Sequence, residues 1–137
     1  MLIRNEEEMI AAGREMAKEM AIAESAILCF YGDLGAGKTT FIKGIAEGLG
    51  IQRDHVSSPT FQYLSIYSGL KQLMHFDLYR IANTLEFLEH GFDEFFTVPG
   101  IVCIEWAERI HDIVPSHAIL ISIEHAVQGY RNIVIKP

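Results

Sequence analysis

The stretch Gly32-Asp33-Leu34-Gly35-Ala36-Gly37-Lys38-Thr39 decides the fold of this 137-residue chain. It matches the pattern G-x-x-x-x-G-K-[ST], in which glycines let backbone N–H groups turn inward and cradle phosphate oxygens at a helix N-terminus. In this pattern Lys38 would neutralise the β- and γ-phosphates. The Thr39 hydroxyl would be a ligand of the Mg²⁺ that bridges the same phosphates. The stretch therefore predicts a site for ATP and Mg²⁺.

The segments on either side of this loop stand in the order that a phosphate-binding loop requires. Residues 26–31 form a short apolar run without alternation, which is typical of a strand covered on both faces of a sheet. After the loop, apolar residues recur at helical intervals as far as Leu49, and Gly50 stands where a C-terminal cap is expected. A simple tight turn could match the motif by chance, but this context favours phosphate binding.

Two further segments predict helices. Asn5 and Glu8 have the spacing of a capping box at the start of an amphipathic helix. Asn83 and Glu86 have the same spacing, and Gly91 would end that second, short helix.

Several runs predict strands. Ser68-Gly69 would join the first two runs into an antiparallel hairpin, and Gln128-Gly129 would join the last two. A helix reaching Pro115 would follow the third run. We expect one domain over residues 1–137, an α/β P-loop NTPase sandwich with a mixed, mainly parallel central sheet and antiparallel hairpins. The runs are residues 61–67, 70–79, 100–104, 118–124 and 130–136.

Two carboxylates stand where a P-loop site needs them. Asp77 and Glu105 each follow an apolar run directly, and a P-loop site uses an acid at the end of a neighbouring strand to hold the metal and its waters. Each acid could instead be a solvated strand end, or could pair with Arg80 or Arg109. Both interpretations stay open at this point.

Three other features also have two interpretations each. Residues 57–60 form a stiff polar turn that could place a hydroxyl against a γ-phosphate, or an ordinary loop. His75 could shuttle protons or be a satisfied, half-buried side chain. Trp106 could stack on a base or partner surface, or belong to the core.

Composition narrows the class of protein further. The net charge of −7 argues against a broad nucleic-acid surface, so any RNA role would need a basic partner. No apolar run reaches the roughly 18 residues that span a bilayer and no signal peptide is evident, so we expect a cytoplasmic protein without membrane association. Cys29 and Cys103 sit in apolar runs without metal-ligand spacing. No guanine-reading N-K-x-D element or arginine-rich lid is evident, which favours ATP hydrolysis.

Four segments together resemble the TsaE (YjeE) family, and the resemblance covers nearly the whole chain. They are Gly32–Phe41, Ser58–Phe61, His75–Arg80 and Ile104–Trp106. The resemblance implies a small bacterial ATPase, weak alone, that is required to make threonylcarbamoyladenosine beside the anticodon of tRNAs. It also implies that TsaD and TsaB are partners and that tRNA is engaged only through their complex.

The resemblance further implies roles for single residues. Lys38 and Thr39 would bind phosphate and magnesium, Asp77 would belong to the metal shell, Glu105 would position metal or attacking water, and Thr60 would sit in a switch-like segment.

Alternative functions are a small-molecule kinase and a nucleotide-gated binding module. The expected catalytic residues are Lys38, Glu105 and Asp77, the metal ligands Thr39, Asp77 and Glu105, and the nucleotide-binding residues Asp33, Leu34, Gly35, Ala36, Gly37, Lys38, Thr39, Thr40 and Thr60.

Overall fold

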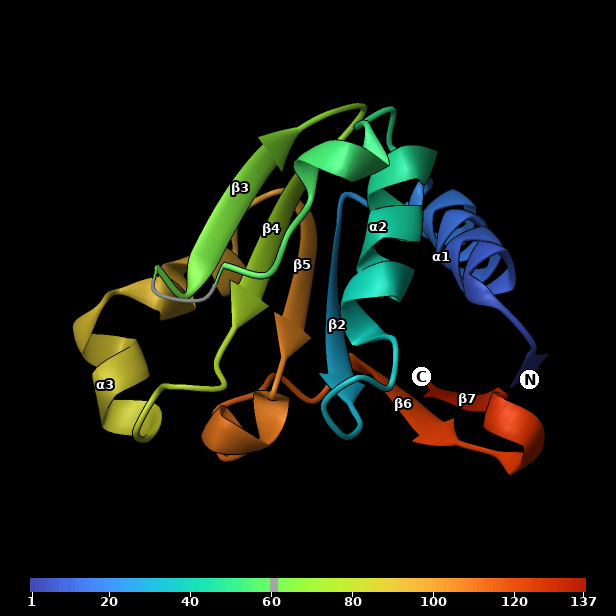
Figure 1. Cartoon of the computed structure of the whole chain (residues 1–137). Helices are drawn as coiled ribbons and strands as arrows, with labels where there is room; N and C mark the ends of the chain where they lie inside the picture. Colours follow the sequence, from blue (N-terminus) through green and yellow to red (C-terminus); the bar gives the residue numbers. More distant parts are fainter. Residues whose placement is uncertain (60–61) are drawn as a thin grey trace.

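Seven strands form one sheet in the computed structural model, which describes residues 1–59 and 62–137. Their order across the sheet is β1-β7-β6-β2-β5-β4-β3 (Figure 1). The strands are β1 (Leu2–Ile3), β2 (Ser25–Tyr31), β3 (Leu64–Ser68), β4 (Gln72–Asp77), β5 (Gly100–Glu105), β6 (Ile119–His125) and β7 (Arg131–Lys136). The α-helices are α1 (Glu6–Met20), α2 (Lys38–Gly48) and α3 (Thr84–Glu89), and short 3₁₀ helices span Arg53–His55, Phe92–Phe96, Ala107–Ile110 and Val127–Gly129.

The centre of the sheet is parallel and its margins are antiparallel. Strand β2 pairs in parallel with β5 on one side and β6 on the other, and β4 pairs in parallel with β5. Strands β3, β7 and β1 join antiparallel to β4, β6 and β7. The predicted mixed α/β sheet with two hairpins is therefore confirmed.

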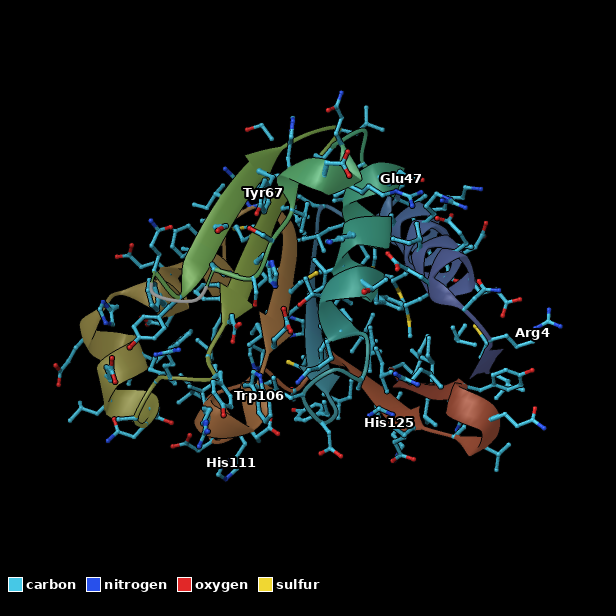
Figure 2. All side chains as sticks on the ribbon, in the orientation of Figure 1. Arg4, Glu47, Tyr67, Trp106, His111 and His125 are labelled. Carbon is cyan, nitrogen blue, oxygen red and sulfur yellow. The ribbon has the colours of Figure 1, made fainter. Side chains whose placement is uncertain are left out.

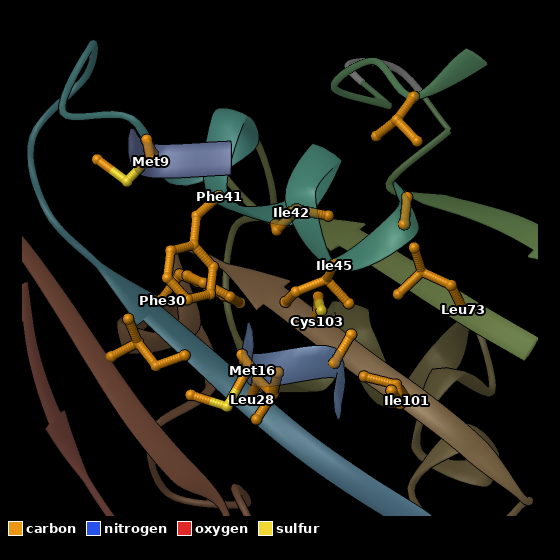
Figure 3. Packing of buried hydrophobic residues seen from close by; sticks show 14 of the residues in the cluster. Met9, Met16, Leu28, Phe30, Phe41, Ile42, Ile45, Leu73, Ile101 and Cys103 are labelled. Atoms are coloured by element: carbon orange, nitrogen blue, oxygen red, sulfur yellow. The ribbon is translucent and has the colours of Figure 1, made fainter. Parts of the chain in front are cut away.

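Two hydrophobic layers cover the sheet. Helices α1 and α2 pack over one face, where Phe41 of α2 meets Phe30 of β2 edge-on with ring centroids 5.5 Å apart (Figure 3). The second core lies on the other face and includes Phe87 of α3 and Ala107 and Ile110 of the 3₁₀ segment after β5. Strands buried on both sides need continuous apolar runs, which is the pattern the sequence has.

Helices α1 and α2 touch backbone to backbone. A Cβ atom on Gly44 would lie 2.2 Å from the carbonyl oxygen of Ile10, and one on Gly13 would lie 2.2 Å from that of Phe41. At the start of α2, the Met9 methyl group lies 2.8 Å from where a Cβ of Gly37 would be. Helix α1 thus supports the glycine loop directly.

The two predicted helix starts are confirmed as N-caps, with a change in the returning bond. The side chains of Asn5 and Asn83 accept hydrogen bonds from the backbone N–H three residues later, at 2.9 and 3.0 Å. The glutamate at that third position does not bond back to the cap. It accepts from the residue before the cap, Arg4 or Ala82, so the box is one residue wider than predicted.

Other boundaries differ from the prediction. The helix expected up to Pro115 is wrong, because only a 3₁₀ turn at Ala107–Ile110 forms. Trp106 enters this turn in a left-handed conformation, and Val114 precedes a proline, which disfavours helical backbone. Strand β1 was not predicted, since two residues carry no periodic signal. Within residues 1–59 and 62–137, every helix is too short or too polar to cross a bilayer.

Candidate functional site

The glycine loop joins the end of β2 to the start of α2. Gly35 has φ +79° and Gly37 has φ +111°, conformations that only glycine adopts without strain. Helix α2 begins at Lys38, so the positive end of its dipole adjoins the loop. The order of strand, loop and helix that an anion-binding loop requires is confirmed.

Lys38 is almost fully enclosed at this loop, with 5% of its surface exposed. Its Nζ donates a hydrogen bond to the carbonyl of Gly32 at 2.7 Å and lies 3.7 Å from the ring centroid of Trp106. Burial lowers the pKa of Lys38, and nearby carboxylates, Glu105 first, offset part of that shift. The ammonium is thus held inside the site by a backbone carbonyl and the face of an aromatic ring.

Trp106 fits neither of its two predicted interpretations fully. Its ring is half-buried, packs 5.0 Å from the ring of Tyr79 and presents its face to the Lys38 ammonium. In Figure 2 it lies at the edge of the sheet where β4 and β5 end. Trp106 is therefore part of the wall around Lys38.

The two acids predicted at strand ends lie side by side. The register of β4 and β5 pairs Asp77 with Glu105, and both side chains are buried, at 7% and 3% exposure. Leu73 and Cys103, which lie two or four residues earlier on the same strands, belong to the core beneath α1 and α2. Since side chains alternate along a strand, both acids face the helix that begins at the loop. The interpretation of either acid as a solvated strand end is wrong.

Glu105 connects the loop helix to two strands. Its carboxylate accepts a hydrogen bond from the Thr39 hydroxyl, at 2.9 Å to Oε2 and 3.2 Å to Oε1. Its Oε2 also lies 2.6 Å from Nε2 of His75. His75 is fully buried, which corrects the expectation of a half-buried side chain.

Asp77 connects to a different part of the chain. Its Oδ2 accepts a hydrogen bond from the Ser58 hydroxyl, and its Oδ1 accepts one from the backbone N–H of Tyr79 at 3.0 Å. Arg109, one predicted alternative partner, donates to the carbonyl of Tyr79 at 3.2 Å. The polar turn at residues 57–59 therefore meets the site through Ser58, whereas Thr60 lies outside the described residues.

One pocket brings these groups together. Its volume of about 340 Å³ lies within the range of small-molecule sites, roughly 300–1,000 Å³. Apart from Ser58, each lining residue was a predicted site residue; Asp33 instead is exposed nearby and Ala36 is buried. The lining residues are Leu34, Gly35, Gly37, Lys38, Thr39, Thr40, Ser58, Asp77 and Glu105.

A second pocket lies on the other side of the same loop. Arg131 of β7 reaches into it, and its guanidinium donates to the carbonyls of Ala36 at 3.2 Å and Gly35 at 3.3 Å. The sequence alone does not reveal this pocket, because its walls come from both ends of the chain. The local signal is an arginine just after a glycine turn. The lining residues are Ile3, Arg4, Asn5, Glu6, Met9, Gly35, Ala36, Gly37, Thr40, Gly129 and Arg131.

The polar groups in the first pocket suit Mg²⁺ that is held jointly by protein, phosphates and waters. They suit an ion held by protein side chains alone less well. The described residues contain no group of three or more His, Cys, Asp or Glu side chains that could hold an ion. Mg²⁺ is bound in many proteins by one or two carboxylates with substrate phosphates and waters. The Thr39 hydroxyl and the carboxylates of Glu105 and Asp77 fit that pattern.

This architecture places the chain among the α/β proteins in which a glycine-rich loop joins a parallel strand of the sheet to a helix. The family model described as "Threonylcarbamoyl adenosine biosynthesis protein TsaE" matches residues 3–133. The chain therefore belongs to the TsaE family, as the four sequence segments indicated.

Individual relatives agree with this assignment. The chain is 39% identical over 114 residues to the tRNA threonylcarbamoyladenosine biosynthesis protein TsaE of Treponema pallidum, covering 83% of this chain and 84% of the relative. It is 37% identical over 127 residues to the protein of the same name from Haemophilus influenzae, covering 90% and 80%. The crystal structure of Bacillus subtilis YdiB superposes with a TM-score of 0.80 at 36% identity, covering 98% of this chain and 82% of that one.

Proposed function

We propose that this chain is the ATP-binding and ATP-hydrolysing subunit of the machinery that makes threonylcarbamoyladenosine in tRNA, acting in the cytoplasm with TsaD and TsaB. The family supports the pathway. The observation that carries the enzymatic part is the meeting of Lys38, Thr39, Asp77 and Glu105 in one pocket at a glycine loop. These are the group types that P-loop enzymes direct at the transferred phosphoryl group.

The first step assigned to the chain is phosphate capture. Lys38 would leave the carbonyl of Gly32 and the face of Trp106 and turn its ammonium to the β- and γ-phosphates. A buried cation that already lacks water pays little further desolvation when it meets an anion. Bound Mg²⁺ would supply neutralisation of phosphate charge, held by the Thr39 hydroxyl with Glu105 and Asp77 as carboxylate partners.

Glu105 is the group best placed to orient attacking water. Its carboxylate is buried at the end of the strand next to β2 and faces the start of α2. A carboxylate there accepts a hydrogen bond from water and aligns it with phosphorus. Asp77, bonded to Ser58, would report the state of the nucleotide to the turn at residues 57–59.

The second pocket supplies a place for the rest of the nucleotide. It shares Gly35, Gly37 and Thr40 with the phosphate pocket, so a ligand cradled by the loop can reach both sides. Its lining combines the apolar Met9 with the polar Asn5, which suits a base and a ribose. We assign the adenosine to this side of the loop.

The lining of the phosphate pocket also accounts for the proposed need for partners. It includes no arginine among the described residues, and an arginine supplied by another protein is a common source of phosphoryl-transfer acceleration. Leu34 at the loop tip is 67% exposed, an apolar side chain beside the entrance. The acidic chain would leave tRNA contact to TsaD and TsaB.

The test is ATP hydrolysis by the purified chain, alone and with TsaB, TsaD and tRNA. We expect weak turnover alone and stimulated turnover in the mixture. Lys38→Ala should reduce both by about 100-fold or more, because its phosphate contact is made in the transition state. Lys18→Ala is the matched control, since that lysine is 71% exposed on α1 away from the loop.

Other outcomes would assign the alternatives. Lys38-dependent ATP binding without turnover in any mixture would identify a nucleotide-gated binding module, with Ser58 as its sensor. Phosphate appearing on an added metabolite would identify a kinase, although the arginine-free pocket lining speaks against a closing basic lid. Absence of nucleotide binding would contradict the proposal altogether.

A further inference from the structure

His75 is a fully buried imidazole with one nitrogen bonded and one not. Its Nε2 lies 2.6 Å from Oε2 of Glu105, whereas its Nδ1 has no hydrogen-bond partner within residues 1–59 and 62–137. His75 stands two residues before Asp77 on β4 and shares that residue's face of the sheet. Buried polar groups are nearly always paired, so an imidazole in this state calls for an explanation.

The hydrogen bonding indicates which nitrogen carries the proton. In the proposed function Glu105 is an ionised carboxylate facing the metal, and such a group only accepts hydrogen bonds. Nε2 of His75 must then be the donor. The proton of this hydrogen bond therefore lies on Nε2.

The two side chains that hydrogen-bond Glu105 would respond differently to nucleotide binding. Thr39 donates to Glu105 here, but its hydroxyl oxygen is the proposed magnesium ligand, so this bond must be released or redirected. His75 lies on a buried strand and is not a proposed magnesium ligand. Among the described side chains that bond the carboxylate, His75 is thus the one that keeps its place.

We infer that His75 is the positioning residue of Glu105, holding its carboxylate by an Nε2–H hydrogen bond in the orientation that meets magnesium and attacking water. The inference rests on the proposed function. A charge-assisted hydrogen bond to a buried carboxylate fixes its plane, which a free glutamate side chain would otherwise rotate. Loss of a residue that hydrogen-bonds a metal ligand reduces metal affinity or activity by about 10–100-fold.

Two substitutions separate positioning from packing. His75→Gln keeps a side-chain N–H at about the reach of Nε2 and can still donate to Glu105. His75→Leu fills the buried site with a side chain that cannot donate. A residue that only fills space would tolerate leucine at least as well as glutamine, because the site is fully buried.

The experiment measures the affinity of each variant for a non-hydrolysable ATP analogue by calorimetry, with and without Mg²⁺. The readout is the factor by which Mg²⁺ tightens binding. We expect His75→Leu to reduce that factor about 10-fold while Mg²⁺-free affinity stays within about twofold, and His75→Gln to stay close to wild type. An unchanged factor in His75→Leu, or an equal loss in both variants, would overturn the inference.

A measurement on the wild-type chain covers the case in which His75→Leu does not fold. Long-range ¹H–¹⁵N NMR of the imidazole should show the Nε2–H tautomer, both before and after Mg²⁺ and ADP are added. An Nδ1–H tautomer would overturn the inference. Wild-type protein whose nucleotide binding is absent or indifferent to Mg²⁺ would instead overturn the proposed function, so the two failures are distinct.

Discussion

The ends of β4 and β5 look equivalent in the sequence and differ in the structure. Each strand ends in a buried acid, and the register places Asp77 opposite Glu105. Yet Glu105 is bonded to Thr39 at the start of the loop helix, while Asp77 is bonded to Ser58 in the turn before β3. The difference shows that equal positions in a sheet need not mean equal contacts: one acid is bonded to the helix that begins at the glycine loop and the other to the segment before β3.

The largest expected effect of this difference is on the chemical step. Glu105→Gln keeps the shape and removes the charge, so the proposed Mg²⁺ and attacking water would lose the anionic oxygen that holds them. We expect kcat for ATP hydrolysis to fall about 100–1,000-fold, with ATP affinity changed far less. Time courses of phosphate release measure kcat, and calorimetry measures ATP affinity. A variant that turns over at half the wild-type rate would remove Glu105 from the reaction.

A smaller effect is expected at the other acid. Asp77→Asn should weaken the Mg²⁺ dependence of turnover about 10-fold, because one proposed carboxylate partner of the metal is lost while Glu105 remains. The charge-assisted hydrogen bond from Ser58 should weaken as well, which limited proteolysis of residues 57–59 can report. Asp112→Asn is a matched control, since that carboxylate bonds Thr84 away from the pocket. Equal losses of turnover in Asp77→Asn and Glu105→Gln would erase the proposed division of roles.

The smallest expected effect concerns the charge of Lys38. Burial lowers its pKa, so the ammonium loses its proton at a lower pH than an ordinary lysine does. Below that pKa the charged form binds phosphate fully, and ATP affinity should fall as pH rises through it. Glu105 raises this pKa more than Asp77 does, so Glu105→Gln should move the fall in affinity to lower pH than Asp77→Asn does. The measurement is ATP affinity between neutral and alkaline pH. The same midpoint pH for the fall in affinity in both variants would refute the expected order.

Much of the fold could be predicted from the sequence because its signals are local. The glycine loop, the apolar runs and the asparagine caps each lie within a few residues, and their elements form as expected. The failed helix before Pro115 follows a left-handed residue, Trp106, that no periodic pattern reveals. Short strand β1 exists only through its pairing with β7, which lies at the other end of the chain.

The candidate site was predictable in its members and not in its connections. Motif and strand-end position identified Lys38, Asp77 and Glu105, and the structure places them around one pocket. The bond from His75 to Glu105 depends on strand register, and the contact of Arg131 with the loop depends on how the last hairpin closes. Such contacts join residues far apart in the sequence, so spacing alone could not supply them.

The most direct test of the account is a crystal structure of the chain with Mn²⁺, a magnesium substitute visible by anomalous scattering, and a non-hydrolysable ATP analogue. We predict phosphates in the glycine loop, Lys38 turned from Gly32 to the phosphates, and an anomalous peak beside the Thr39 hydroxyl and the Glu105 carboxylate. A nucleotide bound away from the loop, or a loop that holds phosphates while Thr39 and Glu105 stay bonded to each other without metal, would contradict it.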